Sequence, residues 1–576
     1  MHLNKKVGLR ILQVLAVFIT VVILCAFSLA WYWKPSVANA IRKNIETSTN
    51  NLYSVTFKDI HINFLTGNFS IDSLKLKPNV RVYHQLYRKN EAPIYLFSII
   101  IKKLEIKNTH PFDFYFNKKL SINQLQIEKP IITAYYNAAM AIKNKLKGNK
   151  FQHPYELIKN SMQSLNIKNI QLKNITLCLQ IDSVLKKQRQ HIFLSDFYVK
   201  NFNIDAQSAI NHKAFYADDV GLTVRDFSYT SNDSLYRINF EECSASSASK
   251  GFNVYNLNII PVRSESNFCD DFGFQKTRYE FAFKRLHFSN FNFEEFIYLQ
   301  KFHADLLTVE KMKCKIHLNK IFEINPYKER KFPQQIPFDI NFPVTIKNIN
   351  LVNGDINYSE KLPANNLRWD FSFKETNGNI TNFSNESNQI KKNNLLKVNL
   401  AFMLNNEAKT ALNLGLYYGD SLRSFYCNGE MGGYNLSKLN AILNPLAKIE
   451  IANCKLQQLK IGLKGNKKGL DADISMKYKN LRVRVLEFDN REKQLKHHKL
   501  YSFLANVMVL SNDNPSVYGN FVHPQFYLKR KQQQGFFNLV WKSILKGCKE
   551  SIGYSEQVEK ELKQRSKKYK SLTRKK

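Results

Sequence analysis

The sequence predicts a mainly β protein, an elongated, curled antiparallel β-sheet that forms a groove, with a few short helices and one N-terminal transmembrane helix. An eight-residue pattern, apolar-x-apolar-polar-polar-apolar-x-apolar, recurs at least twelve times along the chain. A run of 23 residues without a charge precedes the first copy. Apolar residues make up 44% of the 576 residues, whereas Gly and Pro number only 20 and 15, which is the composition of a folded chain.

The uncharged run extends from Ile11 to Trp33 and is long enough to cross a bilayer as a helix. Basic residues precede it, and Trp31 and Trp33 close it with aromatic rings of the kind found at membrane interfaces. A cleaved signal peptide is the alternative, because small residues near the end of the run could form a cleavage site. A signal peptide usually has a shorter apolar region and no W-Y-W sequence after it. We therefore expect residues 1–34 to be a cytoplasmic start and a retained anchor, with the bulk of the chain outside the cytoplasm.

The repeated octet predicts one continuous β body over residues 35–530. Apolar residues two apart lie on one face of a strand, so each half of the octet is a strand with one dry and one wet side. The polar pair shifts this phase by one residue, which predicts a bulge or a sharp bend inside a long antiparallel ladder. Turn sequences separate the strands, and no parallel crossover is indicated. The octets start at Val55, Phe69, Ile99, Leu120, Leu165, Phe197, Leu222, Phe252, Leu286, Leu307, Val344 and Ile449.

Three segments of the body lack the strand pattern. Residues 35–51 predict a short helix between the anchor and the first strand, and residues 138–165 predict a helix with a loop. Residues 434–445 have the apolar spacing of a helix, with Asn435 as its N-cap and Pro445 as its stop.

The C-terminal segment, residues 531–576, is predicted to be an amphipathic helix followed by a basic tail. Residues 535–548 place an apolar, aromatic-rich face along one side of a helix, and this face either caps the open end of the sheet or lies on a membrane or a partner. Residues 560–576 hold nine basic residues against one acid. The apolar face consists of Phe537, Val540, Trp541, Ile544 and Leu545.

The charge and the cysteines exclude several classes of function. The formal net charge is +38, but most of the lysines fall singly on the polar positions of the octets, as on a solvated face, so we expect no nucleic-acid partner. Eight cysteines form no C-x-x-C motif and no histidine stands at metal-ligand spacing, so no metal site and no cofactor is expected. Cys314 and Cys454 occupy apolar positions of octets, where a thiol packs like a small apolar group.

Catalytic motifs are absent from the sequence. No nucleophile elbow, zinc-protease, dinucleotide or Walker motif is present. The adjacent carboxylate pairs, such as Glu241 with Glu242, would point to opposite faces of a strand and could not act together. We therefore expect a protein that is not an enzyme.

Several stretches of this chain resemble the AsmA family of Gram-negative bacteria, which are AsmA-like and TamB-like proteins anchored in the inner membrane. The start, Y-S-V-T-F-K-D-I-H-I-N-F-L-T-G-N-F-S-I-D-S-L-K-L-K-P at 53–78, is similar to the strand, turn and strand that open the sheet in that family. L-S-I-N-Q-L-Q-I-E-K-P-I-I at 120–132 and the stretch at 342–360 match further parts. Residues 429–490 resemble the AsmA-like C-terminal region, from G-E-M-G-G-Y-N-L-S-K-L-N onward.

The resemblance implies a single-pass protein of the bacterial inner membrane with most of its chain in the periplasm. It implies a β-groove that binds or conducts phospholipid between the envelope membranes or supports outer-membrane biogenesis, with envelope proteins as further partners. The alternative is a structural or assembly factor of the cell envelope that has a closed β core and transports nothing.

Apolar positions of the octets are the candidates for lipid contact. A charge at such a position would block an acyl chain, whereas a charge at a polar position of the same octet would be tolerated. The candidate groove residues are Ile167, Phe288, Phe291, Phe293, Ile346 and Ile349.

Overall fold

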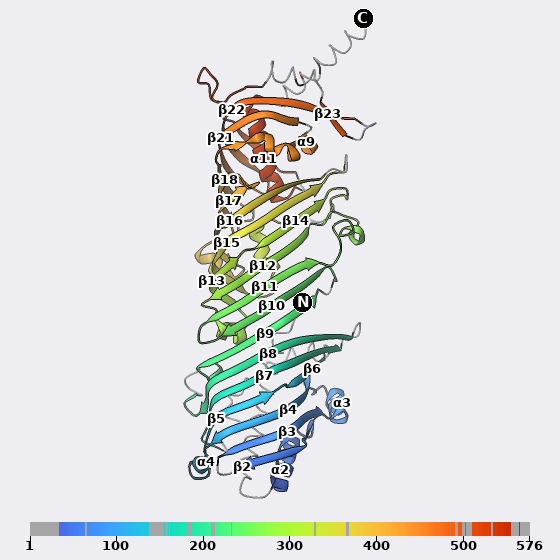
Figure 1. Ribbon diagram of the computed structural model, residues 1–576, viewed down its shortest axis with the longest axis vertical. Helices are drawn as coiled ribbons and strands as arrows, with labels where there is room; N and C mark the ends of the chain where they lie inside the picture. The colour runs from blue at the N-terminus through green and yellow to red at the C-terminus, as the bar shows by residue number, and fades with distance from the viewer. Residues whose placement is uncertain are drawn as a thin grey trace. The chain divides into compact units, whose positions relative to one another are not determined.

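The computed structural model describes residues 34–554, except for 64–65, 138–154, 156–158, 160–161, 183–186, 209–213, 232, 328–329, 364–367, 448, 490–493, 498–501, 503–509 and 532–533, together with residues 561 and 564. The chain divides into two compact units. Each consists mainly of strands of a curled β-sheet, which confirms the predicted fold class at this level (Figure 1). Unit 1 contains Met1–Asp233, Ile238–Asn256 and Phe288–Lys301, and unit 2 contains Ser234–Arg237, Leu257–His287 and Phe302–Lys576.

The predicted anchor, Ile11–Trp33, lies outside the described residues. No helix in the described part of the chain is long and apolar enough to cross a membrane.

Unit 1 holds the strands up to the first half of β11. Its helical elements are α2 (Lys34–Ser48), α3 (Val80–Arg88), α4 (Pro111–Asn117), the 3-10 turn η1 (Ala214–Tyr216) and the π-helical turn η3 (Glu295–Leu299). Its strands are β1 (Tyr53–Thr56), β2 (Asp59–Asn63), β3 (Asn68–Pro78), β4 (Tyr95–Thr109), β5 (Lys119–Glu128), β6 (Ile131–Asn137), β7 (Ser164–Asp182), β8 (Lys187–Asp205), β9 (Asp219–Thr230), most of β10 (Tyr236–Ser246) and the start of β11 (Gly251–Pro261).

Unit 2 holds the strands from β12 onward. Its helical elements are η2 (Asp270–Phe272), η4 (Pro333–Asp339), α8 (Ser387–Lys392), η5 (Leu436–Leu439), α9 (Asn440–Ala447) and α11 (Phe536–Ser551). Its strands are β12 (Arg278–Ser289, up to His287), β13 (Phe302–Glu310), β14 (Lys313–Asn319), β15 (Val344–Lys361), β16 (Arg368–Ser384), β17 (Leu395–Leu404), β18 (Ala408–Tyr417), β19 (Phe425–Met431), β20 (Tyr434–Asn435), β21 (Ile449–Asn466), β22 (Gly469–Asp489), β23 (Gln494–His497) and β24 (Gln525–Lys529).

The helices agree with the sequence in most places. Helix α2 and helix α11 form where they were predicted. The side chain of Asn435 caps η5 by accepting a hydrogen bond from the backbone N–H of Ser437 at 3.1 Å. Pro445 does not stop α9, which continues to Ala447. The helix predicted within 138–165 falls mostly outside the described residues, and its last two residues belong to β7.

Most strand pairs are antiparallel, but parallel pairs occur in two places where none was predicted. Strands β5 and β6 are consecutive pieces of a broken strand that both pair antiparallel with β4 and parallel with β7. In unit 2, β13 and β14 are likewise consecutive strands that both pair parallel with β15. Strand β14 also pairs antiparallel with β12. Parallel neighbours need a long connection. The segments 138–163 and 320–343 provide it, and they lack the octet pattern.

The predicted bend of the octet is confirmed inside a strand in four of the twelve copies, and two more copies have the same left-handed residue just after the end of a strand. In these copies the second polar residue has a left-handed backbone, with φ between 48° and 53°. Asn and Asp adopt this conformation at less cost than most residues, and a single left-handed residue turns the strand. Ile71 and Leu74, on either side of Ser73, are both 0% exposed, and the β3–β4 ladder keeps its register from Asp72–Lys103 to Leu74–Ile101, so the apolar residues on both sides of the bend stay on one face. The six residues are Ser73, Asn201, Asp226, Asn256, Asn290 and Lys311.

The left-handed position gives a direct test of this account. Asp226 is exposed and has a φ of 52°, so we expect Asp226→Val to destabilise the protein by about 1 to 2 kcal/mol, because a β-branched side chain clashes with the following carbonyl there. Asp226→Gly, which has no Cβ, should be neutral or slightly stabilising. Urea unfolding of the two variants checks this. Equal losses for valine and glycine would show that the bend does not depend on the left-handed residue.

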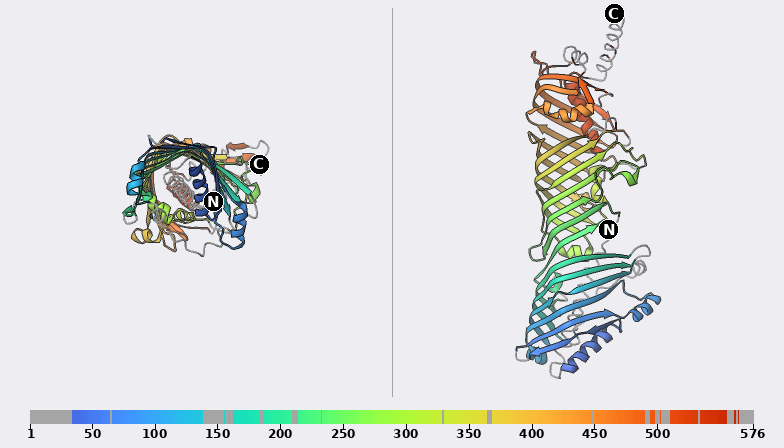
Figure 2. Two further views of the ribbon diagram at one scale, coloured as in Figure 1. Left: turned by 90° about the horizontal axis from the view of Figure 1, so that it is seen from below. Right: turned by 45° about the vertical axis from the view of Figure 1, so that its right-hand side comes forward.

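Each unit has a closed core on the apolar face of its sheet. In unit 1, Ile41 and Ile45 of α2 are 0% and 3% exposed and pack on the strands β3 to β7, so that α2 lies within the curl of the blue strands (Figure 2). In unit 2, Phe536 and Leu539 of α11 pack on β18 to β22. Helix α11 approaches the sheet closely at Gly547, where a Cβ atom would lie 2.3 Å from Ile474 Cγ1. Helix α11 therefore caps part of the apolar face of unit 2, which was one of the two alternatives for this segment.

Candidate functional site

The apolar face of unit 1 changes from closed to partly exposed along the chain. On β3 to β5 its residues are almost fully buried, as at Ile71, Leu104 and Leu125, each 0% exposed. On β9 and β10 apolar residues such as Phe227 and Phe240 are only partly buried. Apolar side chains that remain partly in contact with water on a concave face are what an apolar ligand would cover.

Aromatic rings dominate the partly exposed face of unit 1. Phe227 of β9 stacks on Phe240 of β10, with ring centroids 4.7 Å apart and an interplanar angle of 13°. Phe252 of β11 stacks on Phe288 at 5.2 Å. Stacked pairs hold each other in place by about 0.5 to 1.5 kcal/mol beyond their burial. The face is therefore a firm apolar surface.

The corresponding face of unit 2 carries an aromatic row on β12. Tyr279, Phe281 and Phe283 are two residues apart on one strand, so they share a face. Their rings stack in sequence at 5.9 Å, with interplanar angles of 8° and 10°. Tyr279 is 40% exposed, and Phe281 and Phe283 are partly exposed. The apolar bodies of these rings suit acyl chains, and burial raises the pKa of the Tyr279 phenol, so this side chain is uncharged at neutral pH.

The structure separates the predicted groove residues into two groups. Ile167 is 1% exposed and lies in the closed core of unit 1, and Ile346 is 6% exposed where β15 pairs with β13 and β16. Ile349, three residues further along β15, is only partly buried. The predicted groove residues Phe288, Phe291 and Phe293 belong to one aromatic cluster in unit 1. The centroid of the Phe291 ring lies 6.1 Å from that of Phe252, 4.8 Å from that of Phe293 and 5.4 Å from that of Phe296. Phe288 and Phe291 are 8% and 4% exposed, so they form the base of this cluster. The predicted anchor residues Ile11, Trp31 and Trp33 lie outside the described residues.

Sequence reasoning missed a buried polar cluster in unit 2. His317 of β14 is 5% exposed, its Nδ1 lies 2.8 Å from Ser359 Oγ, and Arg368 donates to Ser359 and to Glu265. Burial lowers the pKa of His317, although the charge of Glu265 opposes this. Ser359 Oγ and the Glu265 carboxylate, at 3.4 Å, both approach the same nitrogen, so the imidazole cannot pass a proton from one to the other. His317 and Ser359 are 42 residues apart in the sequence, and Arg368 and Glu265 are 103 residues apart. No local sequence motif therefore indicates this cluster.

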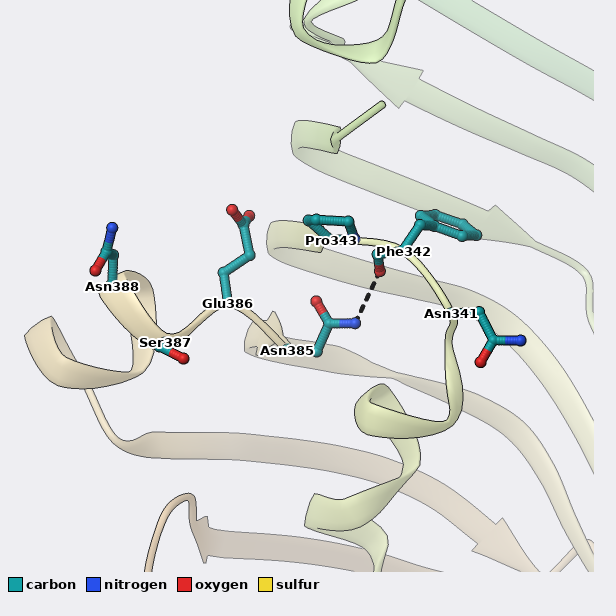
Figure 3. A pocket seen from close by; sticks show the side chains of 7 residues that line it. All are labelled: Asn341, Phe342, Pro343, Asn385, Glu386, Ser387 and Asn388. Carbon is teal, nitrogen blue, oxygen red and sulfur yellow. Dashed lines mark hydrogen bonds between the residues drawn. The ribbon is translucent and has the colours of Figure 1, made fainter. Parts of the chain in front are cut away.

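A shallow pocket of about 450 Å³ in unit 2 is lined by five residues of polar type and by Phe342 and Pro343 (Figure 3). Asn385 crosses its floor and donates to the carbonyl of Phe342 at 2.8 Å. The carboxylate of Glu386 accepts a hydrogen bond from Thr345 at 2.8 Å and pairs with His303. These polar groups are held by partners within the protein.

The buried thiols behave as apolar groups, as predicted for the two octet positions. Cys314 and Cys454 are 4% and 0% exposed. Burial raises the pKa of Cys314 to about 11 and that of Cys454 to about 12, and it raises the pKa of Cys243, on β10, to about 12. These thiols are protonated at neutral pH, and a protonated thiol is a poor nucleophile and a poor metal ligand.

The chain was also compared with known proteins, and no family model and no curated protein sequence matches it. The resemblance to the AsmA family therefore rests only on the stretches quoted above.

Proposed function

We propose that this chain is a membrane-anchored, AsmA-like protein of the bacterial envelope that binds phospholipid on the apolar face of its curled sheet. In this proposal the partly exposed aromatic face on β9 to β11 of unit 1 and the row on β12 of unit 2 contact acyl chains, while the head group stays in water. The observation that carries the proposal is the row of Tyr279, Phe281 and Phe283, an uncharged and partly exposed aromatic surface on a strand.

The hydrophobic effect gives such a face enough affinity for a lipid. Each buried CH₂ group contributes about 0.8 kcal/mol, so an acyl chain that places even half of its methylenes on the face gains several kcal/mol. Part of this gain is lost because the lipid must leave a bilayer, in which its chains are also shielded from water. The result would be weak, reversible binding, which suits a protein that carries or conducts lipid between membranes.

The proposed location rests on the uncharged run and on the resemblance to the AsmA family. An anchor at residues 11–33 would hold the chain in the inner membrane with its bulk in the periplasm, and envelope proteins would be further partners. The second candidate function is a structural or assembly factor. The closed cores around Ile167 and Phe536 support this alternative, because the apolar face of the strands in those cores is covered.

Lipid analysis of the purified full chain tests the proposal. We expect phospholipid to co-purify with the wild type and to be lost, by about tenfold or more, from a variant with both Phe281→Asp and Phe283→Asp, because unpaired charges on the face repel acyl chains. Lys284→Asp is the matched control, since Lys284 is exposed and occupies a polar position of the same strand. Equal lipid in all three proteins, or none in the wild type, would favour the structural factor.

A further inference from the structure

Unit 2 presents an apolar loop tip to solvent. In the loop between β22 and β24, Val517 is 79% exposed and Tyr518 is 89% exposed. Phe521 and Val522 follow at 38% and 40%. We call Val517, Tyr518, Phe521 and Val522 the apolar tip.

The base of this loop is fastened to β22. Asn514 is 1% exposed, and its side-chain Nδ2 donates to the carbonyls of Met476 at 2.7 Å and Val522 at 2.9 Å. Its Oδ1 accepts from the backbone N–H of Val522 at 2.8 Å, which closes the loop. The backbone N–H and carbonyl of Asn514 pair with Tyr478 at 3.1 Å and 3.0 Å.

The tip itself is a tight turn. The N–H of Ser516 donates to the carbonyl of Asn520 at 2.9 Å, and Gly519, with a φ of 79°, donates to the carbonyl of Ser516 at 3.0 Å. The apolar side chains are thus held outward by a hydrogen-bonded loop. A surface that is already ordered loses little conformational entropy when it binds.

The end of α11 lies beside the base of the loop. The N–H of Ser511 donates to the carbonyl of Ile552 at the end of α11, at 3.1 Å, and the hydroxyl of Tyr478 donates to the carbonyls of Ser511 and Ser551 at 3.0 Å and 3.4 Å. From this point the chain continues into residues 560–576, with nine basic residues and the single acid Glu561.

We propose that this end of unit 2 docks on the surface of an anionic phospholipid bilayer. The side chains of Val517 and Phe521 enter the boundary between head groups and acyl chains, the ring of Tyr518 lies at the level of the head groups, and residues 560–576 bind their negative charge. An apolar insertion and a basic segment together give stable but reversible membrane binding, whereas either alone is weak. This docking is separate from lipid binding on the sheet and does not depend on it.

Flotation with vesicles tests the docking. The full chain is placed in phosphatidylcholine nanodiscs, which occupy its N-terminal apolar segment, and is mixed with vesicles of phosphatidylcholine alone or with added phosphatidylglycerol. We expect the wild type to float only with the phosphatidylglycerol vesicles and to be released by salt. A variant with Val517→Ser and Tyr518→Ser should bind about tenfold more weakly or worse, because it loses most of the inserted apolar area.

Two further variants complete the experiment. Replacing the six basic residues Lys567, Lys568, Lys570, Arg574, Lys575 and Lys576 by Gln should also abolish flotation. Phe537→Ser changes a side chain on α11 that is 73% exposed and should leave flotation unchanged. The proposal would be overturned if the wild type did not float with vesicles that contain phosphatidylglycerol, or if the tip variant floated as well as the wild type. Circular dichroism of each variant establishes that it is folded.

Discussion

Ile167→Asp is expected to unfold unit 1. Ile167 is 1% exposed on β7, within a core that contains Ile41 of α2 and the strands β3 to β7. A carboxylate at this buried position would lose its hydrating water and gain no charged partner. The free-energy cost is several kcal/mol, which is a large part of the stability of a typical domain. Limited proteolysis and circular dichroism measure the loss.

Lys168→Asp is the matched control for this position. Lys168 is the next residue on β7 and is exposed, so a carboxylate there stays in water and the protein should fold as the wild type does. A folded, protease-resistant Ile167→Asp variant would contradict the closed core of unit 1.

Phe536→Ala is expected to destabilise unit 2 by about 3 to 5 kcal/mol. Phe536 is 4% exposed at the start of α11, and its ring lies 4.9 Å from that of Phe425 and 5.6 Å from that of Phe332. Its removal leaves a cavity between the helix and the sheet, because neither neighbour can follow it inward. The midpoint of urea unfolding reports the change.

The neighbouring residue supplies the control for α11. Phe537 is 73% exposed, so Phe537→Ala should change the stability by no more than about 0.5 kcal/mol. Equal effects of the two substitutions would mean that α11 does not pack on the sheet through Phe536.

The strands could be predicted because they depend on local chemistry, and the octet specifies which residues share a face. The left-handed residue could not be predicted from residue type alone, because Asn201 and Asp226 are left-handed whereas Asp59 and Asn169, at the same position of other octets, are not.

The phase of α11 was predicted less well. The predicted Val540, Trp541 and Ile544 do pack on the cores of unit 2, but Phe537, which was placed on the same face, is 73% exposed. The prediction also missed Phe536 and Leu539, which are the most deeply buried apolar side chains of the helix.

The octets could not predict which helices pack over the apolar faces of the strands. Ile167 and Phe283 are both apolar residues of amphipathic strands, but α2, which is distant in the sequence, packs over the strands of unit 1 that contain Ile167. The parallel pairs of β7 and β15 likewise depend on long connections whose path no local pattern specifies. The cluster around His317 joins residues from distant strands, so its members show no motif.

Photo-crosslinking in living cells tests most directly the claim that lipid contacts the partly exposed aromatic face. A photoreactive residue is placed at Phe240 in unit 1 and at Phe283 in unit 2, with two comparison sites, the exposed Lys284 and Ile122, which is 1% exposed in the closed core. The account predicts phospholipid adducts at Phe240 and Phe283 and none at Lys284 or Ile122. Folded protein without lipid adducts at Phe240 and Phe283, or with equal adducts at Lys284, would contradict it.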